Sequence, residues 1–158
     1  MKSNFLLIAL LGIAVAFGAC STAGTSPLAV NTNASGHALR GFDAVAYFAV
    51  DSAVRGDAKY EYVWNGAKWL FSSEENMKKF QADPEAYAPQ FGGYCSYAVS
   101  EGYTANGDPE AWKVVDGKLY LNYNKDVKQK WEQNQTERIE RGRANWQEFK
   151  NKKPEHRG

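Results

Sequence analysis

The sequence predicts an α+β domain, in which a small antiparallel, twisted sheet of two hairpins plus a further strand carries short helices and a long C-terminal helix packed on it. Three observations lead to this prediction: two pairs of aromatic or β-branched runs separated by Asn-Gly or Asp-Gly, helix-capping residues between them, and an amphipathic stripe near the C-terminus. The length of 158 residues is that of a single domain.

The first residues are typical of a signal peptide, which we expect to span residues 1–19. Lys2 precedes an apolar run over residues 5–17, and small residues follow. A helix of that run would be about 20 Å long, which is less than the ~30 Å hydrocarbon core of a bilayer. We therefore expect export rather than a membrane-spanning anchor.

Cys20 is the expected site of lipidation. Residues 17–20, Phe-Gly-Ala-Cys, resemble a bacterial lipobox, although Phe17 replaces the usual Leu, Val or Ile. Ordinary cleavage after Ala23 stays open as the alternative. If Cys20 is acylated, it is the first residue of the mature protein. Ser21 at the next position is typical of lipoproteins that are sorted to the outer membrane. The lipid bilayer would then be a partner, with the protein on its periplasmic side.

The remaining chain divides by composition. Residues 20–36 are small and polar and predict a flexible tether, residues 37–150 the folded body, and residues 151–158 a disordered tail. Because Cys20 is either acylated or removed, Cys95 has no partner for an intramolecular disulfide.

The strands are predicted from their composition and from the turns between them. Residues 41–50, GFDAVAYFAV, favour a buried strand. Residues 60–64 and the run AKWLF flank Asn65-Gly66, and residues 112–115 and 118–123 flank Asp116-Gly117. Both dipeptides favour tight hairpins, because the two turn residues must accept positive φ.

Capping residues predict the helices. Ser72 and Glu75 suggest a capping box, and Asp83-Pro84 suggests a second helix start. Asn124 is the expected cap of a C-terminal helix over residues 125–150, in which Gly142 allows a break or bend. The string Asp-Pro-Glu-Ala-aromatic occurs at residues 83–87 and 108–112, which is too short to define a repeat.

Residues 65–87, NGAKWLFSSEENMKKFQADPEAY, resemble the YHS domain, a small α+β module. The matching positions are Gly66, Trp69, Phe71, Ser73, Phe80, Pro84 and Tyr87. The flanking motifs GFDAVAYF, GGYCSYAVSEGY, GDPEAW and DGKLYLNY are similar to the longer YHS proteins of bacterial exported or lipoprotein type. The resemblance covers roughly residues 38–131.

Metal binding is the activity that the resemblance implies, through a pair of cysteines. In this chain Ser72 and Asn76 occupy those two positions. A hydroxyl or an amide does not replace a thiolate for a soft or borderline metal, so this role does not carry over to them.

Cys95 is therefore the residue for which a functional role must be weighed. As a ligand it could hold a copper or zinc ion with His37 or Met77, and as a thiol redox group it would need a cation or His37 nearby. The simpler interpretation is a small buried side chain, because Val99 shares its face. Tyr94 and Tyr97 beside it could line a groove or could bridge sheet and loop.

We expect a non-enzymatic binding or accessory module, because no catalytic pattern stands out. With two histidines and no nucleophile elbow, a Ser-His-Asp set is not supported. The 19 basic and 18 acidic residues nearly balance, which argues against nucleic acid as a partner and leaves a protein or a small ligand. A copper-binding or thiol redox protein that uses Cys95 is the alternative.

Overall fold

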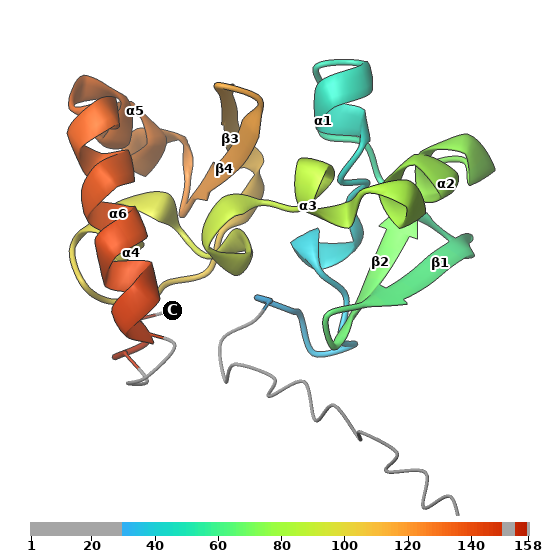
Figure 1. Ribbon diagram of the computed structural model, residues 1–158, viewed down its shortest axis with the longest axis horizontal. Coiled ribbons are helices and arrows are strands. Elements are labelled where there is room, and N and C mark those ends of the chain that lie inside the picture. Colours follow the sequence, from blue (N-terminus) through green and yellow to red (C-terminus); the bar gives the residue numbers. More distant parts are fainter. Residues whose placement is uncertain (1–29, 150–153, 158) are drawn as a thin grey trace, which may run out of the picture.

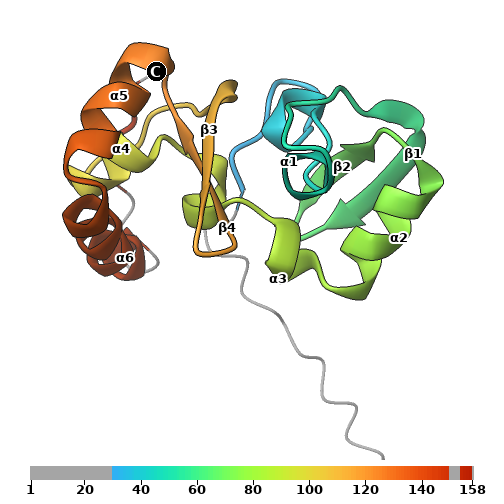
Figure 2. The ribbon, with the colours of Figure 1, turned by 90° about the horizontal axis from the view of Figure 1, so that it is seen from above.

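The computed structural model describes residues 30–149 and 154–157. Figure 1 shows two halves side by side, with the N-terminal half in blue to green and the C-terminal half in yellow to red, and Figure 2 shows the same division from above. The predicted signal peptide, Cys20 and most of the predicted tether lie outside the described residues. No helix within the described residues is long and apolar enough to cross a membrane.

Each half consists of short helices around one antiparallel hairpin. The first half contains the 3-10 helix η1 (Leu39–Gly41), α1 (Ala46–Ala49), β1 (Asp57–Trp64), β2 (Ala67–Phe71), α2 (Glu74–Ala82) and α3 (Pro84–Tyr87). The second half contains the 3-10 helix η2 (Gln90–Gly93), α4 (Ser96–Ser100), β3 (Asp108–Val115), β4 (Lys118–Asn122), α5 (Lys125–Gln133) and α6 (Gln135–Phe149). The predicted α+β class is confirmed.

Both predicted hairpins are present. Asn65 and Asp116 have φ of 50°, and the glycines that follow them also have positive φ, as such tight turns require. The hairpins form two separate two-stranded sheets, and not the one sheet that the sequence predicted.

The predicted strand near Val45 is wrong, because this segment forms α1. Asp43 lies just before the helix, and its Oδ1 accepts hydrogen bonds from the backbone N–H of Val45 (2.8 Å) and Ala46 (3.3 Å). A carboxylate in this position stabilises the first turn of a helix. This local cap outweighs the β propensity of the aromatic and β-branched residues.

The predicted helix starts are confirmed at two of three places. The side chains of Asp83 and Asn124 accept hydrogen bonds from the backbone three residues later. At α2 the cap is Ser73, whose Oγ accepts from the N–H of Asn76 at 3.1 Å, and not Ser72.

The C-terminal helical region contains two helices where the sequence predicted one. The interruption falls at Asn134, whose φ of −132° and ψ of 46° are not helical. Helix α6 continues through Gly142, which is buried against the ring of Phe91, so that the glycine serves close packing and not a break.

The two halves repeat one succession of elements: a 3-10 turn, a short helix, a hairpin with a bulge and a nine-residue helix. In both hairpins the register shifts at the same place, between Asp57 and Glu61 and between Asp108 and Trp112. Three consecutive residues with positive φ precede each short helix, namely Leu39, Arg40 and Gly41 in the first half and Phe91, Gly92 and Gly93 in the second.

Close backbone contacts follow the same correspondence. A Cβ atom built on Gly56 would lie 2.5 Å from the Cβ of Leu70, and one built on Gly107 would lie 2.9 Å from the Cβ of the equivalent Leu121. Equivalent pairs across the halves include Leu39 and Phe91, Asp43 and Cys95, Gly56 and Gly107, and Ser73 and Asn124. The chain thus contains two structurally similar units.

The core consists of clusters of buried residues. In the first half Trp69, Phe71 and Phe80 pack together, and in the second half Tyr120 packs on Trp131 with a centroid separation of 5.4 Å. The first cluster also contains Leu119 and Leu121 of β4, so the two halves share part of their core where they meet.

Candidate functional site

Asp43 is the centre of a buried polar cluster in the first half. Its side chain is fully buried, and its Oδ2 accepts hydrogen bonds from the backbone N–H of Ser72 (2.8 Å), the hydroxyl of Ser72 (2.6 Å) and the amide of Asn76 (2.7 Å). With the two bonds that Oδ1 accepts, the carboxylate joins η1, α1, β2 and α2. Such a satisfied network stabilises one arrangement of these elements.

This cluster contains the two positions that carry cysteines in the YHS pattern, Ser72 and Asn76. Their polar atoms are directed to Asp43 and to each other, with 3.3 Å between the Asn76 amide nitrogen and the Ser72 hydroxyl. A hydroxyl, an amide and a carboxylate already engaged by five donors do not suit a soft or borderline metal ion. The residues present therefore do not fit the metal role that the resemblance implies.

Cys95 lies in the core of the second half and is 1% exposed. Its sulfur is 4.0 Å from Oδ1 of Asn122, and Ala98 and Ala105 pack beside it. Burial raises the pKa of the Cys95 thiol, although backbone groups of Ala98, Tyr123 and Tyr97 act in the opposite direction. Burial and the direction of this pKa shift both favour the protonated thiol over the thiolate.

His37 does not share its neighbours with Cys95. His37 pairs with Lys68 of β2 in the first half, and its Nε2 is 4.0 Å from a carboxylate oxygen of Glu61. Cys95 pairs with Leu121 of β4 in the second half. Within the described residues no three His, Cys, Asp or Glu side chains are grouped as metal ligands would be.

Tyr94 and Tyr97 bind the C-terminal helices to the second half. The ring of Tyr94 lies 6.0 Å from the ring of Trp146, and the guanidinium of Arg138 lies 4.1 Å from the centroid of Tyr97. Neither tyrosine lines the cleft at the junction of the two halves.

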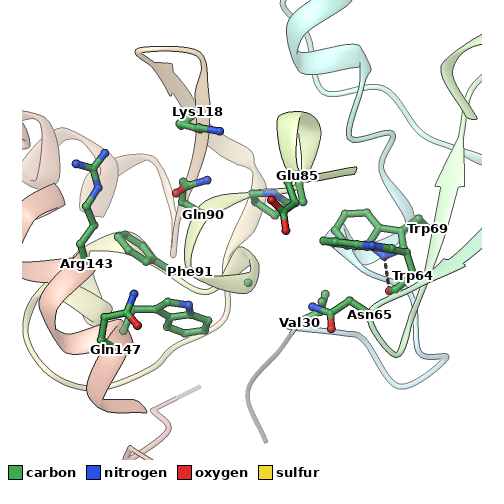
Figure 3. Close-up of a pocket in the computed structure, with 14 residues that line it drawn as sticks. Val30, Trp64, Asn65, Trp69, Glu85, Gln90, Phe91, Lys118, Arg143 and Gln147 are labelled. Atoms are coloured by element: carbon green, nitrogen blue, oxygen red, sulfur yellow. Dashed lines mark hydrogen bonds between the residues drawn. The ribbon is translucent and has the colours of Figure 1, made fainter. Parts of the chain in front are cut away.

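A cleft of about 440 Å³ lies where the two halves meet. This volume is within the range of sites for small molecules. Figure 3 shows Trp64 and Trp69 on one side and Phe91, Gln147 and Arg143 on the other. The lining residues are Val30, Trp64, Asn65, Trp69, Glu85, Ala88, Pro89, Gln90, Phe91, Gly92, Lys118, Arg143, Trp146 and Gln147.

Aromatic rings form two walls of the cleft. On the first-half side, the rings of Trp64 and Trp69 are 5.7 Å apart, and the Trp69 Nε1–H donates to the carbonyl of Trp64 at 3.0 Å (Figure 3). On the second-half side, the rings of Phe91 and Trp146 are 6.0 Å apart. Trp64 also packs on Phe80, and Trp146 packs on Phe91, so the rings are held in place before a ligand enters.

The sequence left a groove at Tyr94 and Tyr97 open as one of two interpretations, beside a role for them in bridging sheet and loop. The structure places both tyrosines outside the lining of this cleft. Trp64 and Trp146 are far apart in the sequence. Trp64 lies in β1 and Trp146 in α6, and the hydrophobic patterns of these elements predict only which side chains are buried. The one signal in the sequence is that Trp146 stands between the polar residues Asn145 and Gln147; Trp64 follows Val63 and carries no such signal.

The fold and the site define an α+β module of two similar units with an aromatic cleft between them. Comparison with protein families gives one match: the YHS domain family matches residues 45–91. The chain therefore contains a YHS domain, which covers most of the first unit. No curated protein and no solved structure matches the chain.

Proposed function

We propose that the protein is a non-enzymatic binding module of the YHS type that holds a small ligand in the cleft between its two halves. The observation that supports this proposal is a cleft of about 440 Å³ with aromatic rings on both sides. Concave sites of this size that combine aromatic side chains with polar groups are typical of ligand binding.

The cleft supports binding better than Cys95 supports metal or redox chemistry. A redox thiol reacts as the thiolate and needs access to its partner. Cys95 is buried, burial raises its pKa, and Asn122 is its polar neighbour. We therefore place the function in the cleft and not at the cysteine.

The test uses N-phenyl-1-naphthylamine, a neutral dye whose fluorescence rises in apolar sites. The wild-type protein should bind it with saturation, and Gln147→Trp should weaken binding about tenfold or more, because a large ring would fill the cleft. Glu148→Trp is the matched control, since Glu148 is exposed on the same helix but does not line the cleft. Equal binding by the two variants, or no saturable binding by the wild type, would contradict the proposal.

We further propose that the module is presented on the periplasmic side of a bacterial outer membrane by a lipid on Cys20. The lipobox-like residues 17–20 support this, and the small polar residues after them would serve as the tether. Expression in a Gram-negative host with a radiolabelled fatty acid should label the wild-type protein and leave Cys20→Ala unlabelled. A labelled Cys20→Ala protein, or an unlabelled wild type cleaved after Ala23, would contradict the lipid anchor.

A further inference from the structure

Aromatic rings flank the cleft on two sides. Trp64 on the first half and Phe91 on the second lie on opposite sides of it in Figure 3. Planar molecules gain most from such a site, since aromatic rings prefer stacked or edge-to-face neighbours with centroids about 4.5–7 Å apart. The aromatic lining therefore favours an aromatic ligand.

The charges at the cleft are unbalanced. Lys118, in β4, and Arg143, in α6, lie together on the second-half side, and Glu85, in α3, lies nearer the tryptophans (Figure 3). Two cations against one carboxylate leave an excess of positive charge. The carboxylate faces the apolar end, so an anionic group is favoured at the end where Lys118 and Arg143 lie.

These two cations are distinguished from the other basic residues around them. On the same helix Arg138 and Arg141 are paired with Glu101, at 2.8 and 3.3 Å. On the neighbouring strand Lys113 is paired with Glu132 at 2.9 Å. Among the described residues, neither Lys118 nor Arg143 forms an ion pair. Their charges are thus available to a ligand.

Amide side chains complete the site. Gln90 lies between Phe91 and Lys118 in Figure 3, and Gln147 lies one helical turn from Arg143 on α6; both line the cleft and can donate or accept hydrogen bonds. Polar groups of this kind orient a ligand whose affinity comes from apolar burial. From these observations we infer that the cleft binds a planar aromatic molecule that carries one acidic group, with its rings between the aromatic walls and its anion at Lys118 and Arg143.

This inference rests on the proposed function, and a pair of dyes separates the two. 8-Anilinonaphthalene-1-sulfonate has the same ring skeleton as N-phenyl-1-naphthylamine but carries a sulfonate. The wild-type protein should bind the sulfonate more tightly than the neutral dye at low salt. The preference should shrink as salt is added, because exposed charges are screened within about 10 Å at 0.1 M.

Charge-removing variants give the decisive comparison. Arg143→Gln and Lys118→Gln should each weaken binding of the sulfonate about fivefold, and the double variant more, while binding of the neutral dye stays the same. Arg143→Lys, which keeps the charge, should retain most of the affinity. Arg141→Gln and Lys130→Gln are the matched controls, since both residues are exposed and lie outside the cleft lining.

The outcomes are distinct. If neither dye binds the folded wild type, the proposed function fails. If the neutral dye binds in the cleft but the sulfonate has no advantage, or responds equally to Arg143→Gln and Arg141→Gln, the inference of an anionic ligand is wrong and the proposed function stands. Thermal unfolding of each variant establishes that the dyes report on a folded protein.

Discussion

Cys95 occupies in the second half of the protein the position that Asp43 occupies in the first. The backbone N–H of Asp43 donates to the carbonyl of Val54 at 2.8 Å, and that of Cys95 donates to the carbonyl of Ala105 at 2.9 Å. Both residues are buried and both precede a short helix. The same backbone frame therefore holds a carboxylate in one unit and a thiol in the other.

In the second half Asn122 accepts one of the hydrogen bonds that the carboxylate of Asp43 accepts in the first half. Its Oδ1 accepts from the N–H of Tyr97 at 3.2 Å, at the start of α4, as Oδ1 of Asp43 accepts from Val45 at the start of α1. The cap thus comes from the adjacent strand β4. In the first half the position of Asn122 is held by the apolar Phe71, which is paired with Asp57 as Asn122 is with Asp108.

Asp43→Ala should strongly destabilise the fold. It would leave the donors of Val45, Ala46, Ser72 and Asn76 without their acceptor in a buried site. We expect the free energy of unfolding to fall by about 3–5 kcal/mol, measured by urea denaturation. Asp126→Ala, at an exposed position, should cost less than ~1 kcal/mol. Similar losses in the two variants would contradict the role of the cluster.

Cys95 should resist alkylation in the folded protein. The measurement uses iodoacetamide and a Cys20→Ser background, so that modification reports on Cys95 alone. Because the thiol is buried and its pKa is raised by burial, the reaction at pH 8 should be at least about a hundredfold slower in buffer than in denaturing urea. Rapid alkylation of Cys95 in the folded protein would contradict this prediction and make the thiol a candidate functional group again.

The stability of the protein should fall at alkaline pH through Tyr47. Burial, and then the nearby carboxylates of Glu110, Asp108 and Asp43, raise the pKa of Tyr47 far above its ordinary value. The unfolded chain ionises this group above pH ~10 while the folded chain does not, so the unfolded state is favoured as pH rises, by about 1.4 kcal/mol per pH unit. Below that pH this contribution is fully present.

Tyr47→Phe provides the measurement for this prediction. The variant should lose about 1 kcal/mol at neutral pH, because the hydroxyl no longer donates to the carbonyl of Pro109, and its stability should fall less steeply above pH ~10. Tyr123→Phe, at an exposed tyrosine, is the control and should follow the wild-type slope. Identical slopes for all three proteins would refute the assignment to Tyr47.

Gly142→Ala should destabilise the protein although alanine favours a helix. A Cβ at this position would lie 2.7 Å from the tip of the Phe91 ring. The expected cost of overpacking is about 1–3 kcal/mol, which exceeds the ~1 kcal/mol gained in helix propensity. In a double-mutant cycle, Phe91→Leu should relieve this cost; additive effects of the two changes would argue against the contact.

The sequence predicts the local features of this fold well. The turns at Asn65 and Asp116 and the caps at Asp83 and Asn124 depend on a few adjacent residues, and these elements are confirmed. The strand predicted near Val45 is wrong because its helix depends on Asp43, whose carboxylate is also bound by Ser72 of a later element. Composition alone does not reveal that contact.

The repeated unit and the cleft depend on relationships that the sequence conceals. The five-residue string shared by residues 83–87 and 108–112 falls on helix α3 in one place and on strand β3 in the other, so it does not mark the repeat. The true correspondence joins dissimilar residues, such as Asp43 with Cys95 and Ser73 with Asn124. The cleft forms only when both units are folded and in contact.

The two walls of the cleft rest on different aromatic groups. Trp64 packs on Phe80 in the first unit, and Trp146 packs on Phe91 in the second. The gap between them is governed by the packing of the two units on each other, in which Leu119 and Leu121 of β4 join the buried cluster of the first unit and Tyr47 packs on Trp112. Substitutions in this packing would change the width of the cleft and the free energy of unfolding together, so the selectivity of such a protein is coupled to its stability.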